Sequence, residues 1–196
     1  MGYEVQAIDP DPEAVSAALK RGVPATVAEW PDFTAPSPEA IVLVRVLHHL
    51  DDIETALDRY QAALPPAGRL LVEDSAFGDM PGWARAWFET WVERTSRAAL
   101  FSTKLHPFVA AVLHGEDPSD QECVHSVAEM ESALRAHFQL QFREPAPYFY
   151  RYISESVLES PAACDLVHSM LENEKSALKE NRLWPLGRRW VGVRVG

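Results

Sequence analysis

The sequence IVLVRVLHHLDDIETALDRYQAALPPAGRLLVED, at residues 41–74, decides the fold. It begins with a β-branched run over residues 41–46, which predicts a parallel strand that is covered on both faces. The strand stops at the polar pair His48 and His49. A polar loop directly after a buried strand is where open α/β sheets bind ligands, so the sequence predicts a functional loop at this junction.

A helix and a second strand follow this loop. Asp51 and Glu54 have the spacing of an acidic capping box, and apolar residues then recur at helical spacing. The Pro/Gly turn at residues 65–68 ends the helix, and residues 69–74 form a second buried strand that finishes in two carboxylates. Polar groups are therefore expected to gather at the ends of two neighbouring strands.

The segment resembles the second half of a class I methyltransferase that uses S-adenosylmethionine, in the small-molecule branch of that family. The resemblance rests on VLHHL at residues 46–50 before a helix, and on the Pro/Gly turn before a strand that ends in acids. Residues 5–12 look like the second strand of the family, and residues 147–152 and 186–192 look like its last two strands. The resemblance implies an α/β, Rossmann-like doubly wound sheet.

The chain is expected to form one methyltransferase-like domain over residues 1–196. Its sheet core would comprise residues 1–77 and 125–196, and residues 78–124 would form a helical lid inserted over the carboxyl edge of the sheet. The family's first strand and its glycine-rich turn should lie before Asp9, where only eight residues precede, and the nine glycines form no GxG. We therefore expect an N-terminally truncated sheet.

The resemblance also implies cofactor contacts in the first half of the chain. Asp9, followed by Pro10, would bind both ribose hydroxyls of S-adenosyl-L-methionine with its carboxylate. The alternative is a helix cap, but Asp11 already has that role. Glu29 and Trp30 would contact adenine, unless they are a solvated acid beside a tryptophan that covers the sheet edge.

Two further cofactor contacts are implied after the central strand, while no catalytic residue can be assigned. Arg45 and Val46 would meet the cofactor, although Arg45 could instead pair with Asp51 or Asp52. His48 and His49 are interpreted as shaping the loop, and methyl transfer needs mainly proximity and alignment. Possible acceptor contacts or bases are His106, His114, Tyr148 and Tyr150, and the tryptophans at 83, 87 and 91 are interpreted as packing residues.

Composition excludes several classes of partner. A formal net charge of −11 without clustered Lys and Arg argues against nucleic-acid binding. No run approaches the about 18 apolar residues of a membrane span. Cys123 and Cys164 lack partners at metal-ligand spacing, which predicts no metal site and indicates buried thiols in a reducing, cytoplasmic compartment.

The first functional hypothesis is a methyltransferase that transfers a methyl group from S-adenosylmethionine to a small-molecule acceptor. The second is a non-catalytic, methyltransferase-like partner or binding subunit that has lost its cofactor cradle. A third, a nicotinamide-dependent oxidoreductase, fits less well, because VLHHL does not resemble that class. A sheet without its central strand would expose strand edges, so homo- or hetero-oligomers are also expected.

Overall fold

The computed structural model describes residues 2, 4–30, 38–75, 80–116 and 125–195. The chain divides into two compact units, Met1–Pro38 and Glu39–Gly196. No helix within these described ranges is long and apolar enough to cross a membrane.

The first unit is a β-α-β arrangement. Strands β1 (Ala7–Asp9) and β2 (Ala25–Val27) pair in parallel, with α1 (Pro12–Lys20) between them in sequence. Helix α1 begins as predicted: the Asp11 side chain accepts the Glu13 N–H at 2.8 Å, and proline occupies the first helical position.

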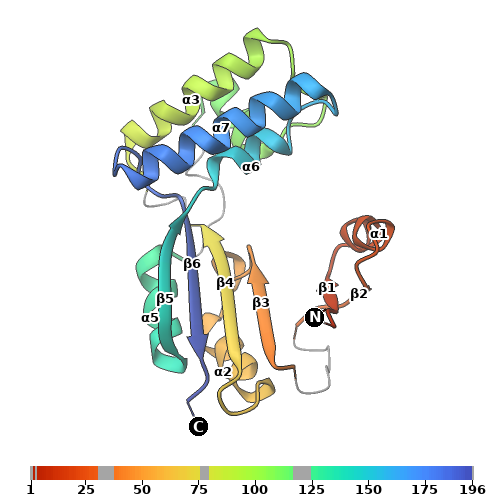
Figure 1. The fold of residues 1–196 in the computed structure, drawn as a ribbon, viewed down its shortest axis with the longest axis vertical. Coiled ribbons are helices and arrows are strands. Elements are labelled where there is room, and N and C mark those ends of the chain that lie inside the picture. The colour runs from red at the N-terminus through yellow and green to blue at the C-terminus, as the bar shows by residue number, and fades with distance from the viewer. Residues whose placement is uncertain (1, 3, 31–37, 76–79, 117–124, 196) are drawn as a thin grey trace. The chain divides into compact units, whose positions relative to one another are not determined.

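The second unit contains a four-stranded sheet with the order β3-β4-β6-β5 (Figure 1). Strands β3 (Ala40–Val44) and β4 (Arg69–Ser75) are parallel, so their carboxyl ends lie side by side. Strand β6 (Gly187–Val193) runs antiparallel to both β4 and β5 (Gln139–Ala146). The short 3-10 helix η1 (Leu47–His49) and helix α2 (Ile53–Ala63) connect β3 to β4.

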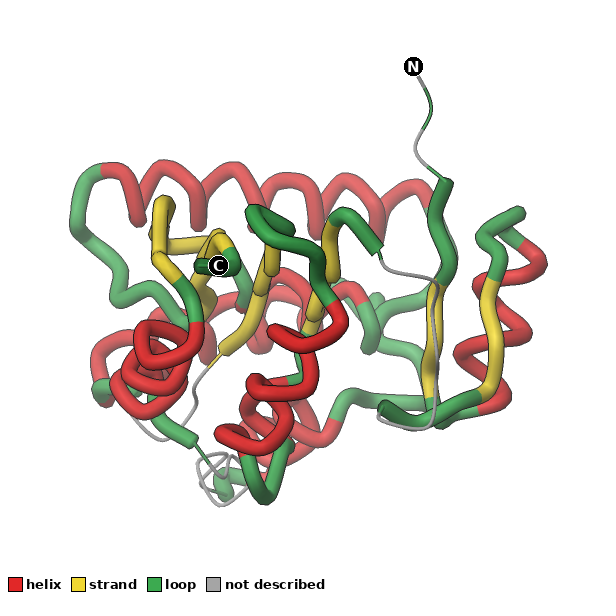
Figure 2. Tube along the Cα trace, turned by 90° about the horizontal axis from the view of Figure 1, so that it is seen from below, coloured by secondary structure: helices red, strands yellow, loops and turns green. Residues whose placement is uncertain are grey.

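Helices cover one face of this sheet. Helix α2 and helix α5 (Val127–His137) lie on the same side of the strands (Figure 2), and Glu131 of α5 contacts the indole of Trp190 on β6. The prediction that β3 is covered on both faces is wrong, because Val42 is 64% exposed and Val44 is 47% exposed on the other face. Leu43, which alternates with them, is buried.

A helical layer lies beyond the carboxyl ends of β3 and β4 (Figure 1). It consists of α3 (Gly82–Arg97), α4 (Pro107–His114), α6 (Phe149–Ser154) and α7 (Pro161–Lys179), which share one apolar core. Of the tryptophans predicted to pack, Trp91 is buried and Trp87 packs against this core, whereas Trp83 is mostly exposed.

Two predicted elements are wrong. Residues 147–152 were expected to form a strand, but the strand is β5, and α6 follows it. The cause is distant in sequence: the buried carboxylate of Glu174 on α7 accepts the N–H groups of Tyr148, Phe149 and Tyr150, which starts a helix there. Helix α2 is capped by Asp52 rather than Asp51, because Asp52 accepts the Thr55 N–H.

The prediction of buried cysteines is wrong for Cys164, which is exposed. It follows the buried Ala163 on α7 and therefore points away from the face that this helix buries. Cys123 lies outside the described residues. The cysteine that can be described thus gives no support for a buried thiol.

Candidate functional site

The loop after β3 is held by a carboxylate at the end of β4. The fully buried Asp74 accepts the N–H groups of Val46 at 3.1 Å and Leu47 at 2.8 Å, and it hydrogen-bonds Nδ1 of the buried His48. The structure thus joins the two strand ends where the sequence predicted a gathering of polar groups. His48 has the structural role that was predicted for it.

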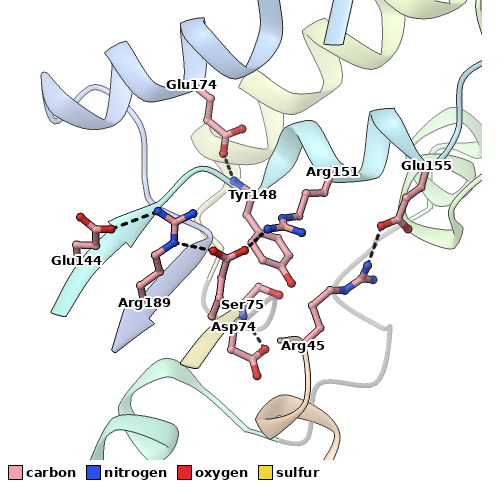
Figure 3. A network of polar contacts seen from close by, with 10 residues as sticks. Arg45, Asp74, Ser75, Glu144, Tyr148, Arg151, Glu155, Glu174 and Arg189 are labelled. Carbon is pink, nitrogen blue, oxygen red and sulfur yellow. Dashed lines mark hydrogen bonds and ion pairs between the residues drawn. The ribbon is translucent and has the colours of Figure 1, made fainter. Parts of the chain in front are cut away.

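Arg45 leaves β3 with a strained backbone. Its φ of 61° lies in the left-handed region, which costs a non-glycine residue about 1 kcal/mol or more and is frequent at functional sites. Its guanidinium pairs with Glu155 at 2.7 Å, rather than with Asp51 or Asp52 (Figure 3). The backbone and the ion pair together fix this side chain at the carboxyl end of the sheet.

His106 lies next to the same carboxylate. Its Nδ1 accepts the Phe108 N–H at 3.1 Å, so the neutral ring carries its proton on Nε2, which lies 3.8 Å from an oxygen of Glu155. Burial, more than the opposing charge of Glu155, lowers the pKa of His106. His106 can therefore donate a hydrogen bond here, but it is not placed to act as a base through Nε2.

Two buried hydroxyl groups meet above the end of β4. Tyr148 at the start of α6 points toward Ser75 (Figure 3), and beyond this contact with each other neither hydroxyl has a hydrogen-bond partner among the described residues. Burial raises the pKa of Tyr148 to about 12, against the opposing effects of Ser75 and Arg45. The phenol therefore stays neutral and can donate a hydrogen bond to a ligand.

An ion network borders these hydroxyls. Glu73 on β4 pairs with Arg151 and, at 2.6 Å, with Arg189. Arg189 also reaches Glu144 at 3.3 Å (Figure 3). Arg151 lies over the ring of Tyr148, 5.2 Å from the ring centroid, and its Nε is buried without a partner in the described part of the chain. The polar groups left without partners around Tyr148 are mainly donors.

The first unit carries the other predicted cofactor residues. Asp9 ends β1, is exposed, and uses one carboxylate oxygen to accept the Asp11 N–H at 2.8 Å. Glu29 and Trp30 follow the neighbouring strand, and the Ala28 N–H bonds the Asp9 carbonyl oxygen at 3.2 Å. Asp9, Pro10, Glu29 and Trp30 thus lie at one end of this small sheet. Arg45 and Val46 belong to the second unit.

Sequence reasoning missed Ser75, Glu155 and Glu174. Ser75 directly follows the carboxylates Glu73 and Asp74 and is the last residue of β4, so its position in the strand could have indicated it. Glu155 lies 110 residues from its partner Arg45, and Glu174 is one of several acids on α7. No local pattern distinguishes these two residues, because their roles arise only from tertiary contacts.

Comparison with known proteins identifies the family. A family model described as a methyltransferase domain matches residues 1–108, more than half of the chain. The chain belongs to this methyltransferase-domain family. Among curated proteins, no sequence relative matches it. The family assignment confirms the prediction of an enzyme of the S-adenosylmethionine-dependent methyltransferase class and supports the first hypothesis over the non-catalytic alternative.

Solved methyltransferases confirm the fold. A methyltransferase from Mesorhizobium loti gives a TM-score of 0.54 at 13% identity, over 97% of this chain and 80% of the other. The N-methyltransferase NodS from Bradyrhizobium japonicum gives 0.50 at 13%, over 97% and 73%. Phosphoethanolamine N-methyltransferase 2 from Haemonchus contortus gives 0.52 at 13%, over 98% and 43%. At these identities the likeness concerns the fold.

Proposed function

We propose that this methyltransferase holds its small-molecule acceptor at the carboxyl end of β4, beneath the helical layer formed by α3, α4, α6 and α7. The observation that carries the proposal is the pair of fully buried hydroxyls of Ser75 and Tyr148, which have no partner among the described residues beyond their contact with each other. An unpaired buried polar group costs about 1–3 kcal/mol, which a protein tolerates where a ligand supplies the partner. An acceptor oxygen or nitrogen is such a partner.

The residues of the first unit fit the nucleoside half of S-adenosylmethionine. One oxygen of the exposed Asp9 carboxylate remains available for a ribose hydroxyl, and Trp30 is a flat neighbour at the same sheet end. The sequence offers no GxG turn for the methionine half. The cofactor supplies an electrophilic methyl group when it is bound. We assign the following residues to its binding: Asp9, Pro10, Glu29, Trp30, Arg45 and Val46.

The chain's own contribution to the chemistry is orientation. Tyr148, whose phenol is neutral at neutral pH, donates its hydrogen bond to a polar atom of the acceptor other than the nucleophilic one, and Ser75 can donate or accept. Neither group removes a proton at neutral pH, and His106 carries its proton on the nitrogen that faces Glu155. The acceptor is therefore a nucleophile that reacts once it is aligned, such as an amine.

The acceptor half of the proposal is tested by Tyr148→Phe. Removing an unpartnered hydroxyl leaves the free energy of unfolding unchanged or raises it by up to about 1 kcal/mol, while methyl transfer to the acceptor falls by about tenfold or more. Transfer of a labelled methyl group to a panel of small amines and alcohols measures the activity, and urea unfolding measures the stability. Tyr150→Phe is the matched control. A destabilised Tyr148→Phe with unchanged transfer contradicts an acceptor role.

The cofactor half is tested separately by titration with S-adenosylhomocysteine. Asp9→Asn should weaken binding by about 10-fold or more, as expected for lost charge-assisted bonds, whereas Asp11→Asn should only loosen the start of α1. Equal effects of the two variants would remove Asp9 from the site.

We also propose a cytoplasmic location, a helical lid over residues 78–124, and oligomers formed through the edges of β1 and β3.

A further inference from the structure

The ion pair between Arg45 and Glu155 joins two parts of the second unit that are far apart in sequence. Arg45 directly follows β3, and Glu155 directly follows α6 in the helical layer. Nη1 of Arg45 lies 2.7 Å from Oε1 of Glu155 (Figure 3). Arg45 is assigned to cofactor binding, whereas Glu155 belongs neither to the cofactor residues nor to the pair of buried hydroxyls. A role for Glu155 would therefore have to act through Arg45.

Hydrogen bonds to β4 already hold the backbone of the loop after β3. The Arg45 N–H donates to the carbonyl oxygen of Glu73 at 3.0 Å. The next two N–H groups along the chain donate to the carboxylate of Asp74. None of these bonds involves the side chain of Arg45, whose φ of 61° is unfavourable for a residue with a Cβ. A contact that fixes this side chain opposes relaxation of the backbone.

Glu155 offers its carboxylate from a fixed position. Arg151 lies four residues before it on the same side of α6 and pairs with Glu73 of β4 (Figure 3). The start of the same helix is held by the buried carboxylate of Glu174. Helix α6 is thus held in place without Arg45, so the ion pair can transmit this fixed position to the loop.

The pair is less exposed than an ordinary surface ion pair. The side chains of Arg45 and Glu155 are 33% and 42% exposed, whereas those of Arg97 and Glu93 on α3 are 77% and 61% exposed. The second oxygen of Glu155 lies 3.8 Å from Nε2 of His106, which carries the ring proton. Because water screens a partly covered pair less, this contact can have a measurable effect on the loop.

On the basis of the proposed cofactor role of Arg45, we propose that Glu155 is a positioning residue for S-adenosylmethionine. Its carboxylate holds the guanidinium of Arg45, and through it the backbone of the loop, in the shape that meets the cofactor. Glu155 itself does not touch the cofactor. Because Glu155 belongs to the helical layer, the cofactor loop is linked in this way to the layer that covers the proposed acceptor position.

The test compares Glu155→Gln, Arg45→Gly and the variant with both changes. Titration with S-adenosylhomocysteine measures cofactor affinity, and Glu155→Gln should weaken it about threefold to fivefold, the loss expected for a partly exposed ion pair. Glycine adopts a φ of 61° without strain and has no side chain to hold. In the Arg45→Gly protein, the change Glu155→Gln should therefore have no further effect on affinity.

Backbone order of the unliganded protein provides a second measurement. The NMR order parameters of the Arg45 and Val46 amides should fall in Glu155→Gln from the rigid value of about 0.85 to about 0.7 or less. Loss of a contact that only stabilises the fold would change neither the affinity nor the order of the folded protein. Glu172→Gln, which removes an exposed ion pair within α7, is the matched control and should change neither measurement.

Two results overturn the proposal. Unchanged affinity and unchanged order parameters in Glu155→Gln would reduce the contact to a surface ion pair. A loss of affinity that persists when Arg45 is glycine would show that Glu155 acts without Arg45. Absence of S-adenosylhomocysteine binding by the wild type would instead overturn the proposed function, whereas lower order parameters in Glu155→Gln would still confirm that Glu155 positions the loop.

Discussion

The buried carboxylate of Glu174 should make the stability of the protein depend on pH. Its two oxygens accept the N–H groups of Tyr148 at 2.6 Å, Phe149 at 3.0 Å and Tyr150 at 3.1 Å, and so hold the first turn of α6. Burial raises its pKa from 4.5 to about 7, although the three N–H donors favour the ionised form. The folded protein therefore binds a proton here more tightly than the unfolded chain.

The sign and size of the effect follow from this shift. Because the folded pKa is the higher one, the contribution of the group to stability is complete below pH 4.5 and is lost as the pH rises to about 7. The shift of roughly 2.5 pH units corresponds to about 3 kcal/mol. Above pH 7 the carboxylate of Glu174 is ionised in the folded protein. The three N–H groups of the α6 turn that donate to it then offset part of the free-energy cost of burying its charge.

Glu174→Gln removes the titration and keeps the shape of the side chain. The free energy of unfolding of the wild type minus that of this variant should fall by about 3 kcal/mol between pH 4.5 and pH 8. Urea unfolding followed by tryptophan fluorescence at five pH values measures it. Glu172→Gln, an exposed acid on the same helix, is the control. A difference that does not vary with pH would refute a raised pKa for Glu174.

Two other predictions concern the loop after β3 and the helical layer. Asp74→Leu should lower the free energy of unfolding by about 2–5 kcal/mol, because three backbone N–H groups lose their acceptor. Asp74→Asn should lower it by about 1–3 kcal/mol, because both carboxylate oxygens accept a backbone N–H and the amide NH2 faces one of these donors in either orientation; urea unfolding measures both variants. Trp87→Ala should lower the free energy of unfolding by about 2–3 kcal/mol through lost ring packing. Trp83→Ala, at an exposed position, should lower it by less than about 0.5 kcal/mol. A Trp87 variant that keeps its melting temperature but loses acceptor activity would contradict the packing role.

Local signals predicted the order of elements well. Asp11 with Pro12 and Ser126 with Glu129 begin α1 and α5, because a cap needs only atoms within three residues of itself. The end of α2 and the start of β4 follow from the Pro/Gly turn at residues 65–68 for the same reason. The carboxylates at the end of β4 marked the candidate site, since a buried strand rarely ends in two acids without a partner nearby.

The parts that failed depend on distant residues. The aromatic run at 147–152 has the composition of a strand, and it becomes a helix only because Glu174 arrives from α7 to accept its first N–H groups. The exposure of Val42 depends on which face the helices cover, which the β-branched run does not encode. Tertiary contacts override local propensity in both cases.

The two buried carboxylates give the site its rigidity. Asp74 fixes the loop that carries Arg45, and Glu174 fixes the turn that carries Tyr148, each by accepting backbone N–H groups that would otherwise be unsatisfied. The two side chains proposed to contact cofactor and acceptor thus depend on acids that need not touch a ligand. Because methyl transfer relies on alignment, a loss of either carboxylate should displace Arg45 or Tyr148 and reduce activity before it unfolds the protein. The same contact of Glu174 that makes stability depend on pH therefore also sets the position of the Tyr148 hydroxyl.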